Sequence, residues 1–236
     1  MQIRTHCQQV TLAILAGGEG SRMGMPKGEL RIGAEPILQY LLGRFEWPGP
    51  TLLVTAPGRE HPPGWESFTA EVSDPVGGLG PLRGVLTALE AAGTEHVLMT
   101  LVDMPGLNGE QLRWLASAFG QERSRRCDIC GLMTSRDAGN SRSGSERRIE
   151  PFPAVFHRDA TPAIRARLDA GRGAVHGLAD DPEFIIVSAP DDWGEDTWIN
   201  LNRPADLRAF SHDVVLTGSQ QDAGRSFPSL GTPGEG

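Results

Sequence analysis

Short apolar segments recur along the chain, and polar or glycine-rich stretches separate them. They lie at residues 12–16, 52–55, 97–101, 129–133, 154–156 and 185–187. Brief apolar runs bounded by turn residues are typical of strands that are buried on both faces of a sheet. We therefore predict a buried strand for each segment.

Amphipathic stretches between these segments predict helices. They cover residues 36–45, 81–92, 109–119, 159–170 and 204–210. Pro36 and Pro81 each open a stretch, as proline often does in a first helical turn. Asn108 provides an N-cap for the third helix. Alternation of strands and helices predicts an α/β fold, with a largely parallel sheet and helices on both of its faces.

Two polar segments depart from this pattern. Residues 134–149 are rich in serine, glycine and arginine, which predicts a flexible surface loop between two strands. Residues 211–236 contain few large apolar side chains, which predicts a disordered C-terminal tail. Residues 1–210 are accordingly expected to form a single domain.

Composition narrows the class of protein. The chain has 236 residues, 39% of them hydrophobic, and a formal net charge of −8. This acidic balance argues against general nucleic-acid binding. No apolar run approaches membrane-spanning length, and the first residues lack a signal-peptide core, so we expect a cytoplasmic protein. Its three cysteines form no disulfide framework, and Cys127 and Cys130 are expected to be structural thiols that are at least half-buried.

The segment LAILAGGEGSRMGMPKGEL, residues 12–30, joins a predicted strand to a glycine-rich loop. Glycines bring backbone N–H groups close to an anion, and cationic side chains neutralise its charge. Arg22 and Lys27 supply such cations in the same loop. The segment therefore predicts a phosphate-binding site.

Two well-known phosphate motifs do not fit this loop. In a P-loop, a serine or threonine follows the lysine, but Gly28 follows Lys27 here. The dinucleotide fingerprint needs G-x-G-x-x-G, and Gly18, Gly20 and Gly24 are one residue too far apart. A plain glycine turn would leave the two cations unexplained.

Three further motifs carry candidate chemistry. Asp74 opens the stretch DPVGGLGPLRG and could accept hydrogen bonds from a sugar hydroxyl or a base amine, or it could simply belong to a turn. Asp103 follows a predicted central strand, where a carboxylate can coordinate Mg²⁺ between phosphates, although strand-end aspartates are common. Asn200 and Asn202 share one face if extended, or Asn202 caps the last helix.

The stretches LAGGEGSRMGMPK, DPVGGLGPLRG, LVDMP and WINLNRP occur in this order over about residues 11–210. Together they resemble the molybdenum cofactor guanylyltransferase family of the Rossmann-like nucleotidyltransferases. The resemblance implies a three-layer α/β/α domain with a mostly parallel, partly mixed sheet. It also implies Mg²⁺-dependent transfer of GMP from GTP to the terminal phosphate of molybdopterin, with release of pyrophosphate. Direct hand-off of the pterin by a partner protein would suit so labile an intermediate.

The resemblance also implies roles for individual residues. The catalytic residues would be Arg22, Lys27 and Asp103, of which Asp103 would bind the metal. The nucleotide would contact Leu15, Ala16, Gly17, Gly18, Lys27, Thr55, Asp74 and Asp103. The acceptor side would comprise Gly80, Pro81, Asn200 and Asn202, with Glu150 as a further pterin-side candidate.

Two positions depart from the family pattern and keep alternatives open. Pro26 precedes Lys27 where the family commonly has an aspartate, and Thr55 stands where it often has an asparagine. A related transferase that uses CTP or another nucleotide on a pterin, sugar or alcohol phosphate is therefore an alternative. A non-catalytic nucleotide-binding module is a third hypothesis, which the joint presence of Lys27 and Asp103 disfavours.

Overall fold

The computed structural model describes residues 7–18, 20–137 and 147–211. A seven-stranded sheet forms the centre of the molecule, in the order β5-β4-β1-β6-β8-β7-β9. The strands are β1 (Val10–Leu15), β4 (Thr51–Thr55), β5 (Ala70–Ser73), β6 (His96–Leu101), β7 (Gly131–Asp137), β8 (Arg147–His157) and β9 (Phe184–Ser188). The strands β5, β4, β1 and β6 are parallel, whereas β8 runs antiparallel to both β6 and β7. The sheet is therefore mixed and mostly parallel, as expected.

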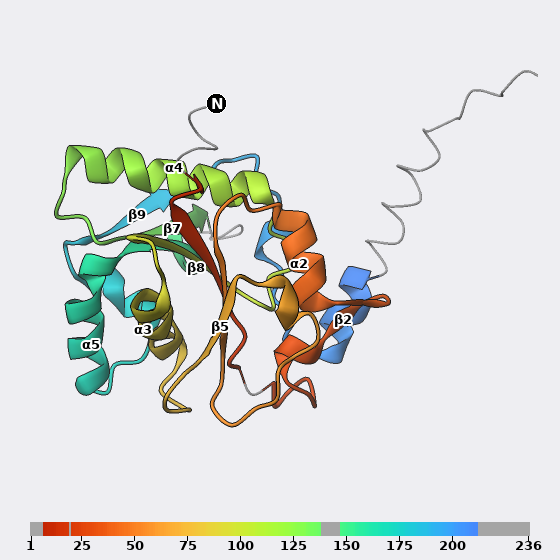
Figure 1. Ribbon diagram of the computed structural model, residues 1–236. Coiled ribbons are helices and arrows are strands. Elements are labelled where there is room, and N and C mark those ends of the chain that lie inside the picture. The colour runs from red at the N-terminus through yellow and green to blue at the C-terminus, as the bar shows by residue number, and fades with distance from the viewer. Residues whose placement is uncertain (1–6, 19, 138–146, 212–236) are drawn as a thin grey trace, which may run out of the picture.

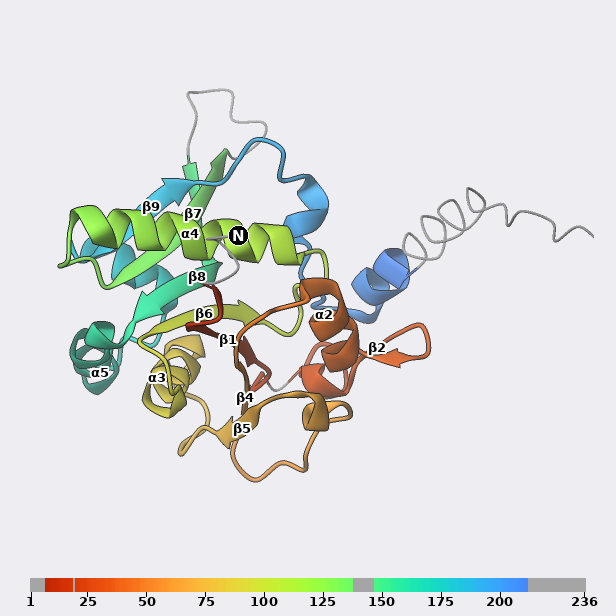
Figure 2. The same cartoon turned by 45° about the horizontal axis from the view of Figure 1, so that its top comes forward.

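Helices cover both faces of this sheet (Figures 1 and 2). They are α2 (Ile37–Phe45), α3 (Pro81–Ala91), α4 (Gly109–Arg125) and α5 (Thr161–Asp169), and residues 204–211 are also helical. Helices α2 and α4 lie on one face, and α3 and α5 lie together on the other. This arrangement confirms the predicted three-layer α/β/α architecture. None of the helices among the described residues is long and apolar enough to cross a membrane.

The burial of the central strand β1 explains why apolar runs in the sequence predicted strands correctly. All six of its residues are buried, because β4 and β6 flank it and helices cover both faces. Leu12 and Ile14 have no exposed surface. A strand buried on both faces reads as a continuous apolar run, and each of the six predicted strands is confirmed in place.

Helix α4 begins as predicted and ends later. Asn108 accepts hydrogen bonds from the backbone N–H groups of Glu110 and Gln111, at 2.9 and 3.1 Å, in a capping box. The helix continues to Arg125 rather than ending at residue 119. Its last turns are polar and carry an ion pair between Arg125 and Glu122, so no apolar periodicity marks them.

The predicted loop at residues 134–149 is wrong at both ends. Strand β7 extends through Asp137, and β8 begins at Arg147. Arg136 Nε lies 2.8 Å from Glu150 Oε1, so a charge pair holds these polar residues across the two strands. Residues 138–146 and 212–236, which include the rest of that loop and almost all of the predicted tail, lie outside the described residues.

Two short elements were absent from the prediction. Edge strand β5 has an alternating and partly exposed sequence, AEVS, which gives no apolar run. Strands β2 (Arg31–Ile32) and β3 (Glu35–Pro36) form a small hairpin after the glycine loop.

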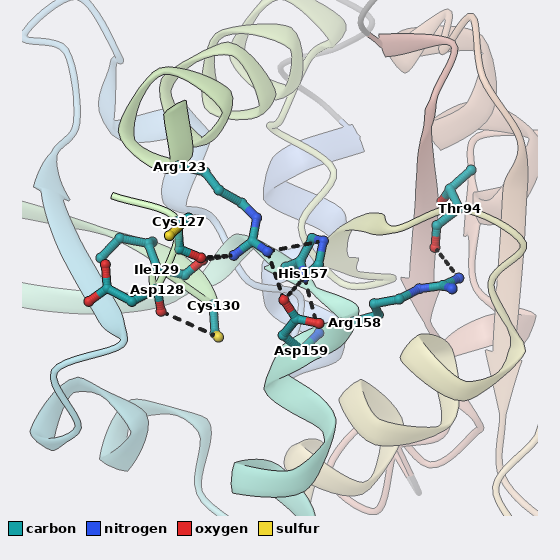
Figure 3. A network of polar contacts seen from close by, with 9 residues as sticks. All are labelled: Thr94, Arg123, Cys127, Asp128, Ile129, Cys130, His157, Arg158 and Asp159. Carbon is teal, nitrogen blue, oxygen red and sulfur yellow. Dashed lines mark hydrogen bonds and ion pairs between the residues drawn. The ribbon is translucent and has the colours of Figure 1, made fainter. Parts of the chain in front are cut away.

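A polar network fastens the end of α4 to the end of β8 (Figure 3). Arg123 contacts Asp159 Oδ2 at 2.7 Å and donates to the carbonyl of Cys127 at 3.0 Å. The ring of His157 lies between them, with Nδ1 2.9 Å from Asp159 Oδ2. Cys130 is half-buried as expected, but Cys127 is exposed, because it lies in the turn that follows α4.

This network makes the stability of the fold depend on pH. Burial, assisted by the charge of Arg123 and opposed by Asp159, lowers the pKa of His157 below its usual value of 6.5. The unfolded chain then binds a proton that the folded chain excludes, so stability falls as the pH drops below about 6.5. We expect thermal unfolding between pH 7.5 and 5 to show a shallower pH dependence in His157→Gln than in the wild type. The exposed His176→Gln variant is the control, and parallel profiles for all three proteins would contradict the prediction.

Candidate active site

A cavity of about 600 Å³ opens at the carboxyl ends of the parallel strands. It is lined by residues that follow β1, β4, β5 and β6, and by the start of α3. The connections from β1 to α2 and from β5 to α3 lead to opposite faces of the sheet (Figure 2). Ligands of open α/β sheets bind where the connections diverge in this way. The cavity is therefore the candidate active site.

One end of the cavity is charged. The Lys27 ammonium group contacts the Asp103 carboxylate directly and donates to Asn202 Oδ1 at 2.8 Å. The backbone N–H of Leu201 donates to the carbonyl of Asp103 at 2.9 Å, which holds the asparagine segment against the end of β6. Three predicted site residues that are distant in the sequence thus meet at one point.

The glycine loop begins where β1 leaves the sheet. Hydrogen bonds from Ala16 N–H to the Val54 carbonyl, and from Val102 N–H to the Leu15 carbonyl, fix the exit on both sides. A Cβ atom at Gly17 would lie 3.4 Å from the backbone nitrogen of Ala56, which is tighter than most real contacts. The backbone there forms the cavity wall, as the sequence predicted.

Asp74 lines the cavity beside the exit of β1, where a Cβ atom at Gly17 would lie 3.7 Å from Asp74 Oδ2. Its backbone N–H donates to the Thr55 carbonyl at 2.9 Å, and its Oδ1 atom is buried without a hydrogen-bond partner. Burial raises the pKa of the Asp74 carboxyl group, while the nearby Thr87 hydroxyl and the Arg83 charge oppose this shift. The Thr87 hydroxyl itself completes no hydrogen bond of normal geometry.

Gly80 and Pro81, which were predicted for the acceptor side, line this same cavity. Gly80 follows a short glycine-rich loop and has a left-handed backbone with φ of +77°. The carbonyl of Gly173 accepts a hydrogen bond from Leu82 N–H at 3.2 Å, so the end of the loop is anchored there.

The other predicted residues do not line the cavity. Ala16 is buried, and Arg22 is exposed outside it. The Thr55 side chain turns toward β5, where its hydroxyl lies 3.0 Å from Ser73 Oγ. Asn200 donates to the Trp198 carbonyl at 3.0 Å, and Glu150 is paired with Arg136 on β7. Their proposed roles remain predictions.

Sequence reasoning missed several lining residues, of which four have side chains that matter for binding. Arg59 lines the cavity and donates to the carbonyl of Gly18 at 3.2 Å. Arg83, Val76 and Leu79 also line it. Arg83 and the two apolar residues belong to the quoted stretch DPVGGLGPLRG, but only their exposure and contacts in the fold single them out.

The fold and this cavity are those of an α/β domain of the nucleotide-binding type, with a glycine-rich loop at the carboxyl end of its central strand. The MobA-like NTP transferase domain matches residues 12–182. The chain therefore belongs to the family of MobA-like NTP transferases, which are nucleotidyltransferases.

Relatives cover most of the chain. A probable molybdenum cofactor guanylyltransferase from Deinococcus radiodurans is 29% identical over 202 residues, which are 86% of this chain and 94% of the relative. One from Opitutus terrae is 30% identical over 203 residues, covering 82% and 91%. The molybdenum cofactor guanylyltransferase from Vibrio cholerae is 27% identical over 199 residues, covering 84% and 89%.

Solved structures confirm the fold. Molybdopterin-guanine dinucleotide biosynthesis protein A from Archaeoglobus fulgidus matches with a TM-score of 0.66 and 18% identity, over 88% of this chain and 99% of the other. The 2-C-methyl-D-erythritol 4-phosphate cytidylyltransferase from Thermus thermophilus matches with a TM-score of 0.64 and 18% identity, over 86% and 98%. The two differ in the nucleotide that their names imply, so the fold alone does not select the base.

The anchored loop gives a matched pair of glycine variants. Gly78 and Gly80 both have left-handed backbones, so alanine at either position costs about 1–2 kcal/mol. A Cβ atom at Gly80 would also lie 2.9 Å from the Gly173 carbonyl oxygen, whereas a Cβ at Gly78 meets nothing within 4 Å. We expect Gly80→Ala to lose about 1–3 kcal/mol more than Gly78→Ala in denaturant unfolding, and to bind nucleotide more weakly in calorimetry. Equal losses would show that the Gly173 contact does not restrain the loop.

Proposed function

We propose that this chain transfers GMP from GTP to the terminal phosphate of molybdopterin and releases pyrophosphate. The observation that carries the proposal is the meeting of Lys27, Asp103 and Asn202 beside the glycine loop. The names of the guanylyltransferase relatives support the nucleotide and the acceptor. The cavity, at about 600 Å³, is large enough for a nucleotide.

The chemistry requires alignment and charge neutralisation rather than a strong base. An oxygen of the acceptor phosphate, which is already ionised, attacks the α-phosphorus of GTP and forms a new P–O bond. The bond to the β-phosphate oxygen breaks, and its electron pair leaves with pyrophosphate. Lys27 and the N–H groups of the glycine loop stabilise that charge, while Asn202 orients the lysine.

Asp103 is the residue that would hold a divalent cation. No group of three or more His, Cys, Asp or Glu side chains among the described residues could bind a metal by itself. Mg²⁺ at phosphates commonly uses only one or two carboxylates, with phosphate oxygens and water completing its shell, and the buried Asp103 carboxylate beside the loop fits this donor set. When bound, Mg²⁺ would neutralise charge on the phosphates.

A transferase for CTP is the second candidate. Pro26 before Lys27 resembles relatives that act on sugar or terpenoid phosphates, and the Thr55 side chain faces β5 rather than the cavity. Neither observation favours guanine.

Nucleotide and acceptor preference test the proposed function. Calorimetric titration with GTP, CTP, ATP and UTP in the presence of Mg²⁺ is expected to show strong binding of GTP alone. Molybdopterin should then stimulate pyrophosphate release from GTP, with sugar phosphates and methylerythritol phosphate as control acceptors. Preferential binding of CTP, or release that depends on a control acceptor, would overturn the assignment.

The charged end of the cavity provides a second prediction. Lys27→Ala is expected to lose about 2–4 kcal/mol of transition-state stabilisation, a factor of about 30 to 10³ in kcat, because a charge-assisted donor to the leaving group is removed. Asp103→Ala should lose metal-dependent turnover while it keeps the far-ultraviolet circular dichroism of the folded protein. Arg31→Ala, on the exposed hairpin outside the cavity, is the control. A loss below tenfold in Lys27→Ala, or near-normal activity in Asp103→Ala, would refute the respective role.

A further inference from the structure

Polar atoms without partners gather at the Asp74 end of the cavity. Among the described residues, the buried side-chain atoms that lack a hydrogen bond are Asp74 Oδ1, Arg83 Nε, Thr87 Oγ1 and Thr134 Oγ1. The first three lie at the end of β5 and in the first turns of α3. An unpaired buried polar group costs about 1–3 kcal/mol, so a cluster of them beside a cavity indicates a partner that arrives with a ligand.

Arg83 is the cationic residue of this cluster, and its contacts within the protein do not use all of its hydrogen-bond donors. It lines the cavity, and its nearest acidic neighbour is Glu90, at 3.7 Å. Arg165 of α5 binds the same carboxylate more closely, at 2.6 Å. The Arg83 side chain makes no hydrogen bond of normal geometry to another residue in the part of the chain that the structure describes. Its Nε–H is therefore buried without a hydrogen bond, and its Nη2 atom has only the long contact to Glu90.

Apolar side chains surround the same end of the cavity. Val76 and Leu79 line it and are 55% and 45% exposed. Besides Met25 of the glycine loop, they are the exposed large hydrophobic residues among those described. Solvent-exposed apolar groups beside one donor and one acceptor suit a flat ring with a polar edge.

The charged end of the cavity gives the direction in which a nucleotide would lie. If Lys27 holds the phosphates there, the base lies against Asp74, Arg83 and the loop of Val76 and Leu79, which line the same cavity. Resting on the proposed function, we propose that Arg83 is a specificity-determining residue that donates hydrogen bonds to O6 and N7 of guanine. Asp74 then accepts from the ring N–H and amino groups of the same base.

Guanine fits this pair of side chains better than the other bases do. Arginine pairs readily with the O6 and N7 acceptors of guanine, whereas adenine presents an amino donor in place of O6. Pyrimidines have no N7 and cannot use both donors in this way. Burial raises the pKa of Asp74, and the charge of Arg83 opposes this rise, toward the ionised form that accepts two hydrogen bonds.

Base analogues that change single atoms test this assignment. Binding of GTP, 7-deaza-GTP, 6-thio-GTP and ITP is measured by calorimetry without acceptor, for the wild type, Arg83→Ala and Arg165→Ala. The wild type should bind GTP about ten- to hundredfold more tightly than 7-deaza-GTP or 6-thio-GTP, which lack a good acceptor at N7 or O6. Arg83→Ala should bind all three about equally and still discriminate against ITP, which lacks the amino group offered to Asp74.

Arg165→Ala is the matched control, because it removes the closer contact to Glu90 on the same face of α3 without touching the cavity. It should keep the wild-type preferences. If Arg165→Ala resembles Arg83→Ala, or if Arg83→Ala keeps the discrimination against 7-deaza-GTP and 6-thio-GTP, the assignment of Arg83 is overturned while the guanylyltransferase proposal stands. If Arg83→Ala loses that discrimination but molybdopterin accepts no GMP, the proposed function fails and Arg83 keeps its role. Preference of the wild type for CTP would overturn both.

Discussion

The contact between Lys27 and Asp103 is the interaction on which the architecture of the site depends. A carboxylate as buried as Asp103 would be strongly destabilising alone, because an uncompensated buried charge costs several kcal/mol. The lysine supplies the compensating charge from the far end of a glycine loop that has little regular structure of its own. Asn202 accepts a second hydrogen bond from the same ammonium group. Three chain segments are thus fixed by polar contacts at a place where packing alone would not fix them.

The antiparallel half of the sheet supports this junction from behind. Arg136 on β7 pairs with Glu150 at 2.8 Å and with Glu195 at 3.0 Å, and its guanidinium group lies 5.5 Å from the centre of the Trp198 ring. These contacts hold the short 3-10 helix of Glu195–Trp198 against the sheet, and the asparagine segment follows directly from it. Glu150 is thus linked to that segment through Arg136. The parallel strands carry the cavity, and the antiparallel strands position the segment that completes it.

Burial decides which elements of this fold could be predicted from the sequence. Strands β1, β4 and β6 are largely buried and predominantly apolar, so they were visible as apolar runs. Strand β5 and the facing ends of β7 and β8 are held by edge pairing and by charge pairs, which leave no periodic signal in the sequence.

The same distinction between apolar burial and polar contacts applies to the site. The residues that meet at Lys27 could be singled out from the sequence, because glycine, lysine and aspartate at strand ends are the residue types that phosphate and metal binding require. Arg59 matters because it is exposed on the cavity and bonds the glycine loop, and Arg83 because its buried Nε–H lacks a hydrogen bond. Both features arise only when the elements around the cavity are brought together.

The charges that line the cavity explain why a site of this kind would need a bound cation. The protein carries a formal net charge of −8, and the proposed reaction would bring a polyanionic nucleotide and a phosphorylated acceptor to the same place. The cavity is lined by three cationic side chains, Lys27, Arg59 and Arg83, and by two anionic ones, Asp74 and Asp103. This local excess is small compared with the charge of a triphosphate, and Lys27 already shares its charge with Asp103. Backbone N–H groups of the glycine loop and of the start of α3 add only partial charges. A divalent cation at Asp103 would release the lysine for the phosphates and supply the missing charge, so an anionic residue is what allows this site to accept a triphosphate.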